Sequence, residues 1–212
     1  MEPTANRIVV RGNLCALPEF SHENHNRKFY RFFLEVPRLS GAVDTLPVIT
    51  ESRILNEIDL SGGQLLTVTG EIRSHNIREN GRRRLLIFVF ASAIRSTDEP
   101  PCNDAVLEGA LCREPVYRRT PLGREICDVM LAVPRPFRRA DYIPCILWGK
   151  NAQEAADTLP GAKLHVTGRL QSRDYVKVVD GVSQTRTAYE LSVTQAEFPD
   201  APDFLEETAA FF

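Results

Sequence analysis

The sequence has 212 residues, of which 43% are hydrophobic and 25% charged, and its formal net charge at pH 7 is -2. This hydrophobic content excludes a wholly disordered chain, and the length accommodates two small domains as readily as one. No apolar run is long enough to cross a bilayer, and the start Met1-Glu2-Pro3-Thr4 lacks the features of a signal peptide, so we expect a cytoplasmic protein with no membrane partner.

The chain contains an internal repeat. The segment from Gly12 to Phe20 returns 97 residues later as Gly109 to Tyr117, and Asp44 matches Asp141 at the same offset. After a one-residue insertion the offset becomes 98, at which Ser74 matches Ser172. A register kept over this length indicates a duplicated domain, because two long repeats are too few for a solenoid.

Each copy shows a predominantly β pattern. The second predicts five strands, over residues 105–111, 125–133, 142–148, 164–172 and 187–193. An alanine-rich helix over 151–159 separates the third and fourth strands, and 52–60 is its counterpart in the first copy. This is the element order of an OB-fold, a partly open barrel. We therefore predict an all-β protein of two tandem five-stranded OB-fold barrels, over 1–97 and 102–196, with an acidic, aromatic tail over 197–212.

Charge is distributed unevenly along the chain. Residues 1–100 hold 13 basic and 12 acidic side chains, residues 101–196 hold 13 and 11, and residues 197–212 hold none and five. Residues 113–139 contain seven arginines and only three acidic residues. Such a local excess is suited to following a phosphate backbone, although an ordinary solvated face has the same composition.

Aromatic residues alternate with cations at three places in the second copy. Phe137 lies in an arginine-rich loop, Tyr142 and Trp148 bound the third strand, and Tyr175 follows the basic fourth strand. Tyr142 and Trp148 are six residues apart, so they face the same side of that strand. Flat rings beside cations are what a sequence-independent binder of single strands requires. The alternative is that these aromatics belong to the core.

Three segments of the second copy resemble bacterial single-stranded DNA-binding proteins. They are Val106 to Pro115, Asp141 to Asn151 with its Ile146-Leu147-Trp148-Gly149-Lys150, and Val166 to Arg173. The resemblance implies that four residues stack bases: Phe137, Tyr142, Trp148 and Tyr175. It also implies single-stranded DNA as the partner, bound without strong sequence preference in DNA replication, recombination or repair.

Cations near these aromatics are the expected phosphate contacts. In the second copy they are Arg118, Arg119, Arg124, Arg135, Arg138, Arg139, Lys150, Arg169, Arg173 and Lys177. In the first copy they are Arg73, Arg82, Arg83 and Arg84, on the predicted hairpin between strands four and five.

The first copy resembles the family more faintly. At the four stacking positions it has Ser40, Thr45, Glu51 and Ile77. Its aromatic strand, Phe29-Tyr30 and Phe32-Phe33, is predicted to lie in the barrel core. We therefore expect the first copy to be chiefly a scaffold.

The resemblance also bears on assembly. Because one chain carries two barrels, a homodimer would present four, like the tetramer usual in the family. The acidic tail over 197–212 resembles in composition the family's tail that recruits replication and repair proteins, but its length and residue order differ. A docked or frayed C-terminus is an equal alternative.

Nothing in the sequence predicts catalysis, a metal or a cofactor. The five cysteines are an odd number without close pairs, which fits reduced thiols rather than disulfides or a zinc knuckle. His22 and His25 flank a carboxylate but lack further ligands nearby. The remaining rival is a primosome-like tandem OB-fold scaffold that binds partner proteins, which burial of the four aromatics would favour.

Overall fold

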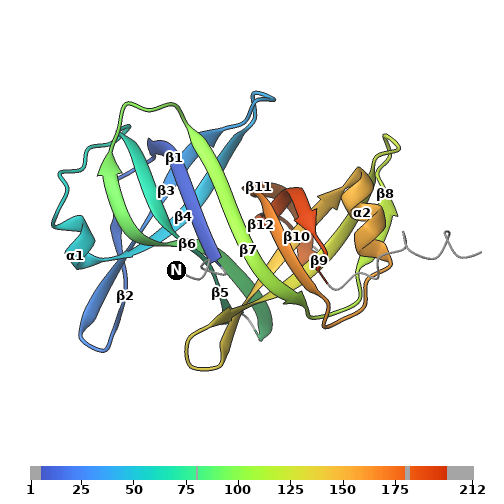
Figure 1. The fold of residues 1–212 in the computed structure, drawn as a ribbon. Coiled ribbons are helices and arrows are strands. Elements are labelled where there is room, and N and C mark those ends of the chain that lie inside the picture. The colour runs from blue at the N-terminus through green and yellow to red at the C-terminus, as the bar shows by residue number, and fades with distance from the viewer. Residues whose placement is uncertain (1–5, 80, 180–181, 200–212) are drawn as a thin grey trace, which may run out of the picture.

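The computed structural model describes residues 6–79, 81–179 and 182–199, which form two β-barrels lying side by side (Figure 1). The first consists of β1 (Asn6–Leu14), β2 (Glu19–Asn24), β3 (Arg27–Pro37), β4 (Val43–Glu51), α1 (Ser52–Leu55), β5 (Leu65–Glu79) and β6 (Arg82–Ser96). The second repeats this order with β7 (Cys102–Leu111), β8 (Val116–Arg119), β9 (Glu125–Arg135), β10 (Arg139–Trp148), α2 (Gly149–Ala156), β11 (Lys163–Val179) and β12 (Val182–Glu197). The predicted all-β tandem OB-fold is confirmed.

Several element boundaries differ from the predicted ones. The strands β2 and β8 were not predicted, because all their residues are exposed and their side chains do not alternate between buried and exposed positions. Helix α2 begins at Gly149, two residues early, and α1 ends at Leu55 rather than near residue 60. Asn56 and Asp59 follow α1, and both residue types favour turns over helix interiors. The hairpin strands β11 and β12 extend well beyond their predicted limits.

Each barrel closes around an alternating apolar interior. In the first, β1 pairs with both β3 and β5, and a short parallel pairing between β4 and β6 closes the barrel. In the second, β7 pairs with β9 and β11, and β10 pairs with β12. Inward side chains such as Ile8, Leu34, Leu107 and Val133 are fully buried. Each such burial contributes about 1.5–3 kcal/mol before entropic costs.

The predicted core assignment of the aromatic strand β3 is only partly right. Phe32 is 2% exposed and lies in the core with Leu34. Phe29 and Phe33 are half-buried and lie on the outward face, because side chains alternate along the strand. The Arg31 guanidinium lies 5.8 Å from the centre of the Phe33 ring on that face.

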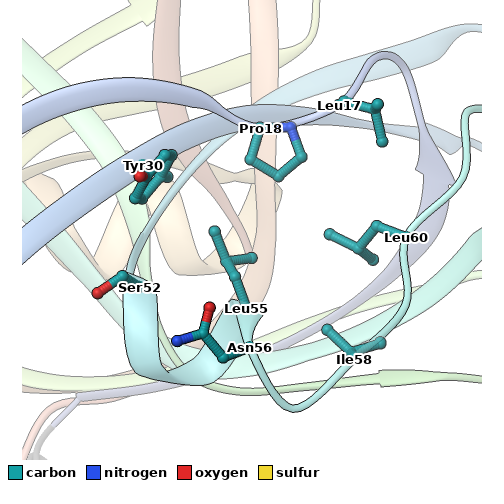
Figure 2. A pocket seen from close by; sticks show the side chains of 8 residues that line it. All are labelled: Leu17, Pro18, Tyr30, Ser52, Leu55, Asn56, Ile58 and Leu60. Carbon is teal, nitrogen blue, oxygen red and sulfur yellow. The ribbon is translucent and has the colours of Figure 1, made fainter.

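An apolar pocket lies between α1 and the segment that joins β1 to β2. Figure 2 shows Leu17 and Pro18 on one side of it, with Leu55 opposite. Its full lining is Leu17, Pro18, Tyr30, Ser52, Leu55, Asn56, Ile58 and Leu60. No predicted binding residue lines this pocket.

The two barrels share one hydrogen-bonded sheet. Strands β1 and β7 pair antiparallel, with Ile8 opposite Ala105, so the strands of both barrels are connected. Beside this seam, Asn6 exchanges two hydrogen bonds with the backbone of Ile72, and Asn103 does the same with Leu170. The asparagines are 97 residues apart, so the seam has an approximate twofold symmetry.

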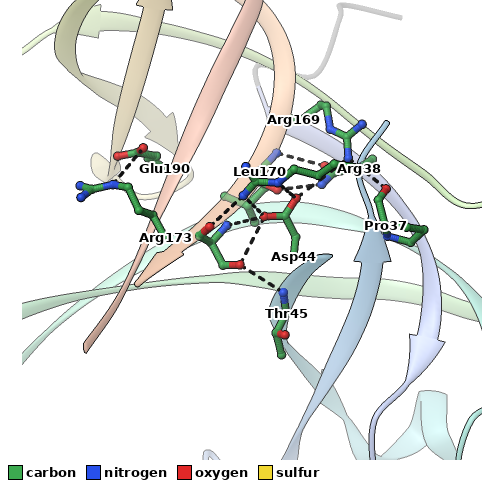
Figure 3. Close-up of polar contacts among 10 residues, drawn as sticks. Pro37, Arg38, Asp44, Thr45, Arg169, Leu170, Arg173 and Glu190 are labelled. Carbon is green, nitrogen blue, oxygen red and sulfur yellow. Dashed lines mark hydrogen bonds and ion pairs between the residues drawn. The ribbon is translucent and has the colours of Figure 1, made fainter. Parts of the chain in front are cut away.

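A second set of contacts between the barrels is built on two fully buried aspartates. Asp44 accepts a hydrogen bond of 2.7 Å from the backbone N–H of Ser172 (Figure 3). In the same way, Asp141 accepts one of 2.7 Å from the backbone N–H of Ser74. Arg38 Nε donates to Asp44 at 2.9 Å. These contacts fix the relative positions of the barrels, because a buried carboxylate without partners is costly.

Candidate nucleic-acid interface

Strand β10 carries two aromatic side chains on the outward face of the second barrel. Tyr142 is 43% exposed and Trp148 is 36% exposed, whereas Ile143, Cys145 and Leu147 point inward and are buried. Six residues of strand separate the two rings by about 20 Å. The strand therefore offers two separated apolar surfaces on one side, long enough to receive several nucleotides.

The Trp148 ring is held at its polar edge. Its Nε1–H donates to Ser192 Oγ on β12 at 3.1 Å. The next residue, Gly149, has φ +54 and turns the chain from β10 into α2. Because the indole N–H is hydrogen-bonded to Ser192, the orientation of the ring is set while part of the ring stays exposed.

Phe137 lies at the tip of the β9–β10 hairpin. It is 94% exposed, and both Phe137 and Arg138 have positive φ values, of 62° and 54°. Left-handed backbone is uncommon for residues other than glycine and costs of order 1–3 kcal/mol where it is imposed. The hairpin thus displays an apolar ring to solvent, followed in the chain by two exposed arginines, Arg138 and Arg139.

Tyr175 lies on the long β11–β12 hairpin. It is 37% exposed and is paired across the hairpin with Arg186. The Arg173 guanidinium lies 6.0 Å from the centre of its ring. Tyr175 is therefore a fourth exposed aromatic ring, beside a cation and on a different hairpin from Phe137.

The four predicted stacking residues are thus exposed on one barrel but do not form one cluster. Tyr142 and Trp148 share a strand face, Phe137 extends from one hairpin and Tyr175 lies on another. None is in the core. Their roles in stacking stay predictions. The four rings are separate sites along one surface and do not line a single pocket.

Several of the predicted phosphate-binding cations already pair with carboxylates. Arg118 Nε lies 2.7 Å from Asp128, and Arg119 lies 2.9 Å from Glu125. The hydrogen bond to Asp128 raises the pKa of Arg118 above its ordinary value. Longer pairs join Arg173 to Glu190 at 3.6 Å and Lys150 to Glu154 at 3.4 Å. A phosphate would have to replace these carboxylates.

Three other predicted cations contact the two buried aspartates. Arg73 and Arg135 each reach Asp141 at 3.3 Å. Arg169 lies 4.0 Å from Asp44 and donates to the backbone carbonyl of Pro37 at 3.4 Å (Figure 3). Arg73 and Arg169 therefore help to hold the barrels together, a part that the sequence did not predict, whereas Arg135 contacts Asp141 within its own barrel.

The remaining predicted cations fall into two groups. Some are exposed and form no ion pair within the described residues: Arg83, Arg124, Arg138, Arg139 and Lys177. Arg84 lines a polar cleft between the β5–β6 and β11–β12 hairpins, whose other residues are Gln184, Thr185, Arg186, Thr187 and Tyr189. The side chain of Arg82 lies outside the described residues.

The site has no arrangement typical of metal binding. No group of three histidine, cysteine or carboxylate side chains capable of holding a metal occurs in residues 6–79, 81–179 and 182–199. Across the same residues, no helix has the length and apolar character needed to span a membrane. What the described surface does present is exposed aromatic rings and cations.

Comparison with protein families gives a match to the second barrel. The model of the "Single-strand binding protein family" matches residues 102–199. This range includes all four exposed aromatics described above.

Similar sequences occur among curated proteins. "Single-stranded DNA-binding protein 1" of Lactococcus lactis is 33% identical over an alignment of 132 residues that covers 51% of this chain and 88% of that protein. "Single-stranded DNA-binding protein" of Halalkalibacterium halodurans is 42% identical over 80 residues, covering 34% of this chain and 48% of that protein. For that relative and others like it, the matched region spans about half their length.

Solved structures of the same overall architecture are those of the single-stranded DNA binding protein from Thermus aquaticus. The wild-type structure has a TM-score of 0.75 at 22% identity, covering 92% of this chain and 93% of that one. A deletion mutant has a TM-score of 0.73 at 23% identity, covering 98% and 100%. At this identity the likeness concerns the fold, and it extends over both barrels.

Proposed function

Since the chain belongs to the single-strand binding protein family, we propose that it binds single-stranded DNA, with little preference for sequence, through the outward face of the second barrel. Bases stack on four exposed rings, those of Phe137, Tyr142, Trp148 and Tyr175. Every base has a π-face, so stacking of this kind tolerates any sequence.

The observation that carries the proposal is the setting of Trp148. Its N–H is bound to Ser192, and its ring remains 36% exposed beside Ile146 on the outward face of β10. A ring fixed before binding loses little conformational freedom when a base stacks on it. An aromatic side chain serving only the core would be buried, which would have favoured the scaffold alternative.

Cations on this surface have two parts in the proposed mechanism. Arg138, Arg139 and Lys177 are exposed and can contact phosphates directly. Arg118 and Arg173 would exchange their carboxylate partners for phosphate oxygens. Phosphate contacts release counterions from DNA, so binding should weaken as salt increases. The function is binding rather than catalysis.

The experiment that tests this function is quenching of intrinsic fluorescence, because Trp148 is the only tryptophan. Oligo(dT) and a duplex of equal length are titrated at two salt concentrations. We expect strong quenching by the single strand, weakened by salt. Because Trp148→Ala lacks the fluorophore, its binding is measured with dye-labelled oligo(dT), and we expect weaker affinity than for the unmodified chain. If neither DNA changes the emission, the tandem-barrel scaffold that binds partner proteins becomes the better account.

We further propose that two chains associate into a homodimer with four barrels, and that the protein acts in the cytoplasm in replication, recombination or repair. The supporting observation is that one chain already joins two barrels through β1 and β7. Light scattering on the full chain should give about twice the 23.9 kDa monomer mass. The proposed recruiting tail lies mostly outside the described residues, which end at Pro199.

A further inference from the structure

The outward face of the first barrel carries its own aromatic cluster. Phe29 and Phe33 on β3 and Phe88 and Phe90 on β6 are all half-buried, while the alternating residues Phe32 and Val89 point into the core. The Phe29 and Phe90 ring centres are 6.0 Å apart. The His22 ring stacks on Phe29 at 4.8 Å with an angle of 11° between their planes.

This cluster occupies the same face as the proposed site of the second barrel, displaced by one strand. In the second barrel Trp148 pairs with Ile126 and hydrogen-bonds to Ser192, and Ile146 pairs with Ser192. In the first barrel the position of Trp148 is Glu51, but Phe29 replaces Ile126 as its pairing partner. Phe90 pairs with Ile49 as Ser192 does with Ile146.

Cations border the rings of the first barrel. The Arg31 and Arg73 guanidiniums each lie 5.8 Å from a ring centre, over Phe33 and Phe90 respectively. Arg27 and Arg53 are mostly exposed and flank Glu51, at 3.9 and 3.0 Å. Rings bordered by cations are suited to bases and phosphates, and the nearby carboxylates should make binding here less sensitive to salt.

We propose that the first barrel has a second base-binding surface for single-stranded nucleic acid, made by Phe29, Phe33, Phe88 and Phe90. The inference rests on the proposed function of the second barrel and extends it. The first barrel has no aromatic residue at the positions that match Phe137, Tyr142, Trp148 and Tyr175, so the proposed surface uses different positions. The shared sheet holds both outward faces in fixed relation, so one strand can contact both barrels.

Photocrosslinking of the unmodified full chain tests the proposal. Oligo(dT) carrying 5-iodouracil is bound at saturation and irradiated, and the crosslinked peptides are identified by mass spectrometry. Crosslinks within residues 22–33 or 88–90, in addition to those in 137–175, are expected. Crosslinks confined to the second barrel would overturn the inference while leaving the proposed function intact, and no crosslinks anywhere would overturn both. A first barrel that binds only proteins would give the confined pattern.

Variants give a second, independent readout. Phe33→Leu with Phe90→Leu keeps apolar packing but removes two rings. The length of oligo(dT) covered per chain should fall by roughly 4 to 16 nucleotides, the span of one OB-fold, and affinity for long oligo(dT) by about tenfold. The control is Leu39→Ala, at a fully exposed loop position, which should change neither. An unchanged covered length in the double variant would contradict the proposal.

Discussion

Asp44 Oδ1 in the first barrel lies 2.7 Å from the backbone nitrogen of Ser172 in the second. The converse pair, Asp141 with Ser74, has the same separation. The serine hydroxyls continue the pattern, since Ser172 Oγ accepts from Thr45 N–H and Ser74 Oγ accepts from Tyr142 N–H. The last bond attaches the backbone of a proposed stacking residue to the other barrel.

Removal of the Asp44 carboxylate should therefore destabilise the whole chain. Asp44→Ala leaves the Ser172 N–H and the Arg38 guanidinium without their buried acceptor, and we expect a loss of about 3 kcal/mol of unfolding free energy in urea denaturation. Asp98→Ala, at an exposed position in the connection between the barrels, is the control. Equal stability of the two variants would show that the buried contact contributes nothing.

A second prediction concerns Gly168, where the β11–β12 pairing shifts register. A Cβ there would lie 2.3 Å from the backbone oxygen of Ser192, and neither backbone can move without disturbing the sheet. Gly168→Ala should lower the unfolding free energy by about 1–3 kcal/mol. Gly62→Ala is a matched control, because a Cβ at Gly62 meets no atom within 4 Å. A cost no larger than that of Gly62→Ala would contradict the close approach.

Ser192→Ala tests whether the orientation of Trp148 matters for binding. The variant removes the acceptor of the indole N–H, which is worth about 0.5–1.5 kcal/mol, so affinity for oligo(dT) should fall by several-fold with little loss of stability. Fluorescence titration measures both affinity and the extent of quenching. Ser183→Ala, at an exposed position on the same strand, is the control. Unchanged affinity in Ser192→Ala would mean that the bond does not position the ring.

Surface arginines and arginines that contact a buried aspartate should respond differently to substitution. Arg139→Ala should reduce the slope of log affinity against log salt by about 1, with unchanged unfolding free energy. Arg135→Ala should instead lower the unfolding free energy, because Arg135 contacts the buried Asp141. The pair is measured by titration at several salt concentrations and by urea denaturation. Identical behaviour of the two variants would refute this division.

The buried thiols predict a dependence on alkaline pH. Burial raises the pKa of Cys127 to about 11 and also raises that of Cys145. Since the folded-state pKa exceeds the unfolded one, the stability linked to Cys127 is fully present below the unfolded pKa and is lost as pH rises toward 11. Unfolding free energies between pH 8 and 10.5 should fall, less steeply in Cys127→Ala. A thiol reagent should label Cys112 in the folded chain but not Cys127.

The architecture could be predicted from local and periodic features of the sequence. The repeat at offsets of 97 and 98 and the order of strands and helix are local or periodic signals, and they sufficed to predict two OB-fold barrels. Tyr142 and Trp148 could be placed on one face of their strand, because alternation is read from neighbouring residues. The assignment of Phe137, Tyr142, Trp148 and Tyr175 as stacking residues came from their neighbouring cations and from the resemblance to the family, and it stays a prediction.

The polar side chains that hold the barrels together could not be predicted from the sequence. Arg73 and Arg169 look like surface cations in the sequence, yet Arg73 contacts Asp141 from 68 residues away and Arg169 contacts Asp44 from the other barrel. Tertiary structure also decided that Phe33 faces outward while Phe32 is buried. Composition made all of β3 look like core; only strand pairing and barrel closure set which of its faces meets solvent, because each depends on partners distant in the chain.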